Sequence, residues 1–223
     1  AESYQRALEA IESGRFDDQI VPVSIPQRKG DPKIFGRDEC PRPTSYEALA
    51  KMKPAFKKDG FGTAGNASII SDGAAAVVVM AREKAEALGC QVLAAIGAQA
   101  SAGIEMKYVL VAPILAVPKC LEKEGISKED VDLYEINEAF AVVTMAAMHD
   151  LKLDHEKVNV HGGACALGHP VGATGARLIV TLIHALKRRQ FKRGVAALCI
   201  GGGEATAIGI DQARVVGRSG LTV

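Results

Sequence analysis

The second half of this chain alternates between short apolar runs and longer segments with helical periodicity. One apolar run ends at Ile136, and others cover residues 158–160, 194–200 and 205–210. Helical patterns cover residues 138–150 and 172–189. Apolar runs of this length that alternate with helices are typical of a sheet whose faces are covered by helices. The alternation therefore predicts an α/β fold with a mixed sheet and helices on both faces. The helix at 172–189 is apolar nearly all round, which favours a buried position.

The first half of the chain is less regular. We expect a helix over residues 2–13 closed by Gly14, a strand over 19–26, a surface loop over 27–44 and a helix over 45–52. An apolar run at residues 72–81 predicts a buried strand, and a Lys/Glu-rich helix then ends at Gly89. A strand over 92–103 and a helix over 113–124, with Pro113 in its first turn, complete this half.

Composition excludes several classes of protein. A net charge of +1 and an aromatic content of 4% without Trp argue against a nucleic-acid surface or an anionic membrane partner. The five cysteines have no Cys-x-x-Cys spacing, so we expect neither a bound metal nor a disulfide framework. These observations favour a reducing compartment. We expect a cytoplasmic protein, with the mitochondrial matrix or another organelle left open.

Three polar residues stand at the ends of predicted strands beside small residues. Cys199 precedes the run Gly201–Gly203, His169 lies between two glycine-rich runs, and Asn137 follows the apolar run that ends at Ile136. A thiol, an imidazole and an amide can together move a proton and stabilise an oxyanion. Each also has an ordinary interpretation, because Cys199 could be a core residue, His169 a turn cap and Asn137 a helix N-cap.

Three sequence blocks carry a resemblance to a known family. They are Asn137-Glu-Ala-Phe140, the glycine-rich stretch from His161 to Arg177, and Cys199-Ile-Gly-Gly-Gly203. In this order and spacing they resemble the thiolase family of acyl-CoA acetyltransferases. The resemblance implies the layered αβαβα thiolase fold with one half-domain complete. It divides the chain into the remainder of a CoA-binding loop domain (1–62), the end of the N-terminal half-domain (63–91) and the C-terminal half-domain (92–223).

The resemblance also implies a role for each polar residue. Cys199 would be the base that takes a proton from the α-carbon of acetyl-CoA, and His169 would donate from Nε2 to the thioester oxygen. Asn137 would orient a water that shares this oxyanion hole, and the backbone N–H of Gly201 would belong to a second one. The role of Glu138 stays open, since the residue could simply complement a helix N-terminus.

Four further residues are implied to contact the substrate. Ser68 matches a serine that contacts pantetheine, and Ala139 and Phe140 match residues that line the acyl and pantetheine channel. Arg42, in a basic loop, is our choice for a contact with adenine, although a solvated loop is the ordinary interpretation. No bound cofactor is expected, because coenzyme A thioesters are the substrates. Cys165, although four residues before His169, is interpreted as a packing residue.

The implied reaction is the Claisen condensation of acetyl-CoA to acetoacetyl-CoA and CoA, or the reverse thiolysis of a 3-ketoacyl-CoA. The family carries its acylated cysteine in a segment before the matching part, so the chain resembles a fragment that is inactive alone. The alternative is a catalytically incomplete, thiolase-like acyl-CoA-binding or scaffold subunit. A homodimer or homotetramer is expected for the full-length form. Residues 106–111 depart from the family pattern, which leaves acyl chain length open.

Overall fold

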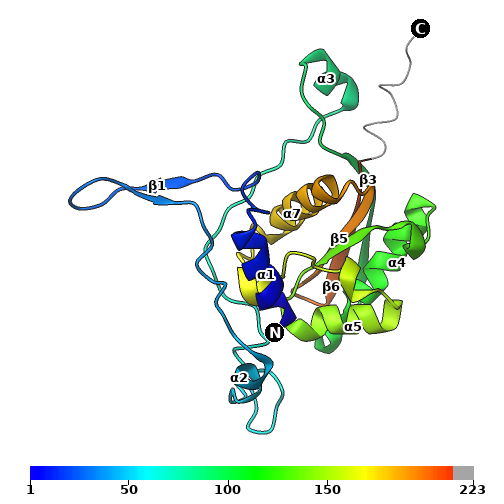
Figure 1. The fold of residues 1–223 in the computed structure, drawn as a ribbon. Coiled ribbons are helices and arrows are strands. Elements are labelled where there is room, and N and C mark those ends of the chain that lie inside the picture. Colours follow the sequence, from blue (N-terminus) through cyan, green and yellow to red (C-terminus); the bar gives the residue numbers. More distant parts are fainter. Residues whose placement is uncertain (213–223) are drawn as a thin grey trace.

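The computed structural model describes residues 1–212 and centres on one mixed four-stranded sheet (Figure 1). Its strands lie in the order β3 (Ala95–Gly103), β6 (Glu204–Asp211), β5 (Arg193–Ile200) and β4 (Leu133–Ile136). Strand β6 is antiparallel to both neighbours, whereas β4 and β5 are parallel, with Ile136 opposite Ala197. The α/β class with a mixed sheet is confirmed.

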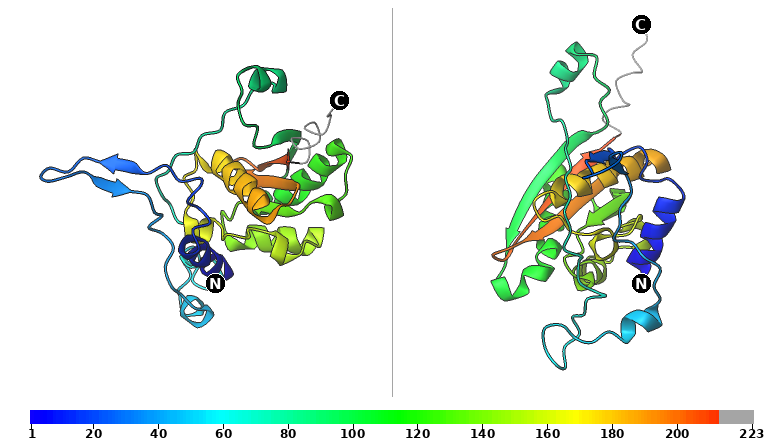
Figure 2. Two further views of the ribbon diagram at one scale, coloured as in Figure 1. Left: turned by 45° about the horizontal axis from the view of Figure 1, so that its top comes forward. Right: turned by 90° about the vertical axis from the view of Figure 1, so that its left-hand side faces the viewer.

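Helices cover both faces of this sheet (Figure 2). Helices α4 (Pro113–Glu124) and α5 (Ala141–Leu151) lie over one face, and α7 (Thr174–Arg189) lies over the other. The side chains of β5 alternate accordingly. Val195 and Ala197 pack in the cluster under α4 and α5, whereas Ala196 packs under α7. The near-continuous apolar sequence of β5 is therefore explained by burial on both faces.

Helix α7 has one fully buried stripe. Leu178, Leu182 and Leu186 are at most 1% exposed and pack on the sheet, while Ile179 and Ile183 are only half-buried. The helix is therefore amphipathic rather than buried all round. It ends in basic residues, and Gln190 adopts the left-handed conformation at its C-cap.

The remaining elements come mostly from the first half of the chain. Helix α1 (Glu2–Glu12) packs against the short α6 (Ala164–Leu167). A hairpin of β1 (Val23–Ile25) and β2 (Lys33–Phe35) extends away from the sheet, so the strand expected at 19–26 is shorter and the expected loop contains a second strand (Figure 2). Two short α-helices, α2 (Tyr46–Ala50) and α3 (Arg82–Ala87), also come from this half. The chain further contains the 3₁₀ helices η1 (Met106–Val111), η2 (Lys128–Asp130) and η3 (His155–Lys157).

The strand predicted at residues 72–81 is absent. This segment has no regular secondary structure, and Val78 is 85% exposed. Its apolar composition suits a buried strand, but a strand is held by ladder hydrogen bonds to a neighbour. The described part of the chain places no strand beside this segment, so the prediction from composition was wrong.

Two boundaries also differ from the sequence prediction. The strand expected at 158–160 makes only isolated bridges, from Val158 to Tyr134 and from Val160 to Gly162. The helix expected from residue 138 begins at Ala141, because residues 137–140 form an extended connection after β4. This connection matters for function, since it holds Asn137 and Glu138.

Among the helices of residues 1–212, none has the length and apolar character that crossing a membrane would need.

Candidate active site

Asn137 lies at the C-terminal end of β4. Its backbone N–H donates to the carbonyl oxygen of Ala197, which continues the pairing of β4 with β5 by one residue. The side chain is 1% exposed, and its Nδ2 lies 3.3 Å from Nε2 of His169. Phe140 is the N-cap of α5, so the ordinary interpretation of Asn137 as an N-cap is wrong. The amide and the imidazole expected from sequence do meet.

Thr174 sets the tautomer of His169. The Thr174 hydroxyl donates its proton to the carbonyl oxygen of Pro170 (2.9 Å), so it accepts a hydrogen bond from Nδ1 of His169 (2.7 Å). Nδ1 therefore carries the hydrogen of the neutral ring, and Nε2 presents its lone pair to the amide of Asn137. Burial, reinforced by the charge of Arg177, lowers the pKa of His169. The neutral, proton-accepting imidazole is favoured near pH 7.

Glycines shape the loop that carries His169. Gly162 and Gly168 have φ of 82° and 97°, in the region that side chains rarely adopt. A Cβ on Gly168 would come within 2.4 Å of the Ser71 Oγ, so only glycine lets the segment around Ser71 lie this close. The glycine-rich sequence before His169 thus allows a tight turn and a close crossing of two chain segments.

Residues 66–70 form a strap that crosses the connection after β4 and the His169 loop. The Ser68 N–H donates to the carbonyl oxygen of Ala139 (3.1 Å), and Ala67 bridges to Phe140. One residue further, the His169 N–H donates to the carbonyl oxygen of Ile69 (2.8 Å). The structure therefore brings the predicted Ser68 against Ala139 in the connection after β4, and the next residues of the strap against the His169 loop.

Cys199 lies near the end of β5, opposite Ala205 of β6. It is half-buried and packs against the same apolar cluster as Ala139 and Phe140. Its strand is the neighbour of β4, and Asn137 pairs with β5 at Ala197, two residues earlier in the chain. Burial raises the pKa of the Cys199 thiol, so the resting group is the neutral thiol. Its conversion to a base requires a partner that favours the thiolate.

The turn after Cys199 is open on one side. Gly201 is exposed, and a Cβ added to it would meet nothing within 4 Å. Gly203 is different, because its φ is 97° and an added Cβ would lie 2.3 Å from the carbonyl oxygen of Ile104. Gly203 therefore allows the β5–β6 turn to pack against the chain after β3, whereas Gly201 faces open space.

Arg42 lies beside α1. Its guanidinium is exposed and sits over the ring of Tyr4 in α1, 5.8 Å from the ring centroid. The structure thus places the Arg42 guanidinium against Tyr4 of α1. Cys165 is 2% exposed, and burial raises its pKa, which agrees with its interpretation as a packing residue.

Sequence reasoning missed a buried Glu–Arg pair near His169. Glu135 in β4 is 1% exposed, and its Oε2 lies 3.8 Å from Nη1 of Arg177 in α7. Neither charged group has a hydrogen-bond partner in the described structure. Burial raises the pKa of Glu135 to about 8, although the charge of Arg177 lowers it. A glutamate inside the apolar run 131–136 was the available signal, because a charge in a buried strand requires a partner.

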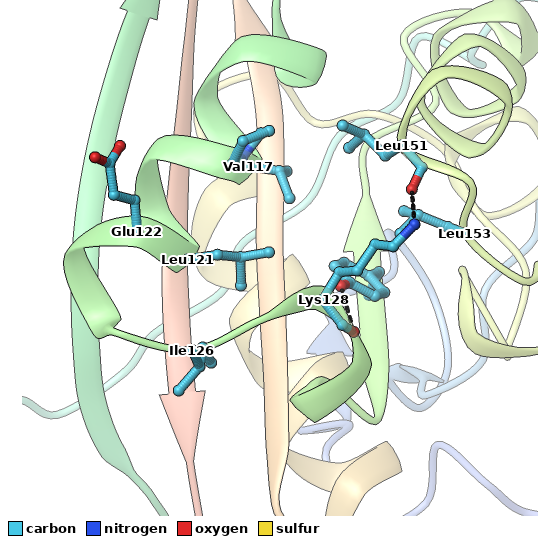
Figure 3. A pocket seen from close by; sticks show the side chains of 9 residues that line it. Val117, Leu121, Glu122, Ile126, Lys128, Leu151 and Leu153 are labelled. Atoms are coloured by element: carbon cyan, nitrogen blue, oxygen red, sulfur yellow. Dashed lines mark hydrogen bonds between the residues drawn. The ribbon is translucent and has the colours of Figure 1, made fainter.

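A cleft lies apart from this group, on the α4 and α5 side of the sheet (Figure 3). Its volume is about 330 Å³, and Val117, Leu121, Leu151 and Leu153 give it a largely apolar lining. Lys128 closes one end by donating from Nζ to the carbonyl oxygen of Leu151 (2.9 Å). None of the residues predicted to be functional lines this cleft.

Within residues 1–212, no three His, Cys, Asp or Glu side chains are grouped as a metal site would need.

The fold and this group define a layered α/β protein with a thiol, an imidazole and an amide near adjacent strand ends. Residues 90–212 match the family described as "Thiolase, C-terminal domain", and residues 1–83 match "Thiolase, N-terminal domain". The chain belongs to the thiolase family. The expected family resemblance is confirmed.

Curated relatives give the same result. The chain is 54% identical to an acetyl-CoA acetyltransferase of Pseudomonas aeruginosa, over 93% of this chain and 53% of that protein. It is 51% identical to an acetyl-CoA acetyltransferase of Allochromatium vinosum, over 95% of this chain and 54% of that protein. The chain therefore spans about half the length of the curated relatives it matches.

Solved structures share the fold. The crystal structure of the Bacillus anthracis acetyl-CoA acetyltransferase matches with a TM-score of 0.91 and 51% identity, over 94% of this chain and 53% of that one. Human mitochondrial 3-ketoacyl-CoA thiolase matches with a TM-score of 0.86 and 36% identity, over 94% of this chain and 53% of that one. The expected thiolase-type layered fold is confirmed by these matches.

Proposed function

We propose that the protein to which this chain belongs is an acetyl-CoA C-acetyltransferase. It condenses acetyl-CoA to acetoacetyl-CoA and CoA, or cleaves a 3-ketoacyl-CoA by the reverse thiolysis. The observation that carries the proposal is the 3.3 Å contact between Asn137 Nδ2 and His169 Nε2, beside the strand that bears Cys199. Membership of the thiolase family and relatives named acetyl-CoA acetyltransferase support it.

In the condensation, the Cys199 thiolate removes a proton from the α-carbon of acetyl-CoA. The new carbon–carbon bond forms to the carbonyl carbon of an acyl group held as a thioester on a second cysteine. The bond from that carbon to sulfur breaks, and the released thiolate recovers the proton. We place the acylated cysteine outside these 223 residues, because Cys40, Cys90 and Cys120 lack a motif that would supply a base and Cys165 is a buried packing residue.

His169 acts on charge that develops at oxygen. Its Nε2 lone pair suits it to accept the thiol proton of the nucleophilic cysteine before that cysteine is acylated, and the resulting imidazolium then donates from Nε2 to the thioester oxygen. Asn137 orients a water in the same oxyanion hole, and the N–H of Gly201 belongs to the second one. Preformed donors of this kind stabilise an enolate without reorganisation.

The remaining residues bind coenzyme A. Ser68 contacts pantetheine, and Ala139 and Phe140 line the channel for the acyl and pantetheine portions, which the crossing strap supports. Arg42, exposed above Tyr4, is proposed for adenine. We further propose a CoA-binding loop region over 1–62, the end of the N-terminal half-domain over 63–91, the C-terminal half-domain over 92–223, and a homodimer or homotetramer as the assembly.

Thiolysis of acetoacetyl-CoA by the native full-length protein tests the proposal. His169→Ala should lower kcat by about 10²–10³, the cost of losing one oxyanion donor. Cys199→Ser should lower it at least as much, because a hydroxyl is a far weaker acid than a thiol. Asn137→Ala should cost less, since a water can persist without it. Cys90→Ser, at an exposed position, is the matched control.

The same assay separates the enzyme from the alternative, a thiolase-like acyl-CoA-binding or scaffold subunit. A wild-type protein that binds acetoacetyl-CoA yet cleaves no 3-ketoacyl-CoA of any chain length would be such a subunit. Near-normal turnover in both the Cys199 and His169 variants would overturn the assigned roles. Rates across several chain lengths would also fix the acyl specificity.

A further inference from the structure

Glu138 follows Asn137 directly but does not behave as a surface carboxylate. The residue is 7% exposed, and its Oε2 accepts hydrogen bonds from the Ser3 hydroxyl (2.8 Å) and from the Cys165 N–H (3.0 Å). Ser3 belongs to α1, and Cys165 belongs to α6. One carboxylate therefore joins the connection after β4 to two helices that are distant in sequence.

Gly163 lets this carboxylate approach the loop. A Cβ on Gly163 would lie 2.3 Å from the carboxyl carbon of Glu138, so a larger residue could not occupy this position without a shift. The Gly163 N–H in turn donates to the Ser3 hydroxyl oxygen (2.9 Å). Glu138, Ser3 and Gly163 thus form a closed group at the start of α6, which we call the Glu138 clamp.

The Glu138 clamp holds the segment that leads to His169. From Gly163 the chain forms the single turn of α6, where the Leu167 N–H donates to the Gly163 carbonyl oxygen (2.8 Å), and His169 follows after Gly168. At the other end of the clamp, Glu138 directly follows Asn137 in the chain. The two residues that must meet at 3.3 Å are therefore tied together through one side chain.

A role at the N-terminus of α5 does not account for this geometry. Helix α5 begins at Ala141 with Phe140 as its N-cap, whereas the Glu138 carboxylate bonds to Ser3 and Cys165. Hydrogen bonds to an ionised carboxylate are about twice as strong as neutral ones, which suits a clamp. Misplacement of a catalytic group by about 1 Å can cost 10²-fold in rate.

We propose that Glu138 is a positioning residue that sets the spacing between Asn137 and His169 in the reaction assigned above, on which this inference rests. Its loss should impair turnover more than binding, because the residues that contact coenzyme A stay in place. It should also loosen the backbone around Cys165, whose N–H would lose its acceptor.

The test compares Glu138→Ala with Glu138→Gln in the native full-length protein. Glu138→Ala should lower kcat for acetoacetyl-CoA thiolysis at least tenfold with KM within twofold, and it should speed hydrogen exchange at the Cys165 amide at least tenfold. Glu138→Gln keeps an oxygen acceptor and should recover kcat to within fivefold of wild type. Val117→Ala, at a buried position of α4 that forms no part of the clamp, is the control for general destabilisation.

Two results would overturn the proposal. The first is exchange at the Cys165 amide that is unchanged in Glu138→Ala, whatever the activity. The second is a loss of kcat no larger than that of a Val117→Ala protein with the same melting temperature. An inactive wild-type protein would instead count against the proposed function, because hydrogen exchange reports the clamp without any turnover.

Discussion

At the scale of single residues, the tautomer of His169 depends on one hydroxyl group. Thr174 accepts from Nδ1 only because its own proton is given to the Pro170 carbonyl oxygen. Without that acceptor, the neutral ring could place its hydrogen on either nitrogen, and the imidazolium would lose a charge-assisted hydrogen bond. The hydroxyl therefore keeps Nε2 ready to accept a proton.

We expect Thr174→Val to lower kcat about tenfold, which corresponds to a loss of about 1.4 kcal/mol in transition-state stabilisation. Thr174→Ser should restore most of the rate, because it returns the hydroxyl. Steady-state thiolysis kinetics give the measurement. Thr181→Val, a buried position farther along α7, serves as the control. Equal kcat in Thr174→Val and wild type would show that the tautomer is held by something else.

A second residue-scale prediction concerns Glu135 and pH. Its pKa in the folded protein is raised to about 8 from the ordinary value of 4.5, chiefly by burial. The folded state therefore binds this proton more tightly than the unfolded chain does. The contribution of this proton to the free energy of unfolding is complete below pH 4.5 and is lost as pH rises toward 8. The free energy of unfolding then falls with a limiting slope of about 1.4 kcal/mol per pH unit.

Glu135→Gln should remove this slope from the free energy of unfolding. Urea titrations at several pH values between 5 and 8 would measure it, and the slope rather than the absolute value matters because the variant also replaces the carboxyl group that faces Arg177. Glu129→Gln, on an exposed turn, is the control. Parallel pH profiles for wild type and Glu135→Gln would contradict the raised pKa.

At the scale of elements, the packing of α1 on the His169 loop depends on Gly162. Its φ is 82°, and an added Cβ would lie 2.5 Å from the Ser3 carbonyl oxygen and 2.8 Å from the Ala7 Cβ. Gly172 in the same loop region lacks a positive φ, and an added Cβ would meet nothing within 4 Å. The two glycines form a matched pair.

Gly162→Ala should lower the free energy of unfolding by at least about 2 kcal/mol, since backbone strain and overpacking each cost about 1–3 kcal/mol. Gly172→Ala should change it by no more than about 0.5 kcal/mol. Thermal or urea unfolding of both variants provides the measurement. A Gly162→Ala protein as stable as Gly172→Ala would mean that α1 does not depend on this close approach.

At the scale of the whole molecule, exposed apolar side chains gather in the segment before α3. Ile70 is 97% exposed, Val78 85% and Val79 65%, whereas the stripe of α7 that faces the sheet is buried. Successive exposed apolar side chains, such as Val78 and Val79, promote association. The 223-residue chain on its own should therefore self-associate through this segment.

We expect Val78→Lys together with Val79→Lys to reduce light scattering of the 223-residue chain at a given concentration. The melting temperature should stay within about 2 °C, because neither side chain packs in the core. Leu88→Lys in the helix α3 region, at a residue that is also exposed, is the control. Undiminished scattering in the double variant would place the association surface elsewhere.

Much of this organisation could be predicted from short stretches of sequence. Helix α4 spans Pro113–Glu124, as predicted, with Pro113 in its first turn and Gly125 in the left-handed conformation at its end. The strands β5 and β6 were predicted within about one residue at each end. These features depend on residues only a few positions apart, so a local pattern is sufficient to determine them.

Contacts between segments that are distant in sequence could not be predicted from local patterns. The predicted strand at 72–81 fails because no described strand lies beside it, and its composition carries no information about a neighbour. The partners of Glu138 and Glu135 likewise come from α1, α6 and α7. Motifs could name Asn137 and His169 as site residues. Their 3.3 Å contact required the folded chain, because ladder pairing and buried charges are satisfied only by groups that tertiary packing brings together.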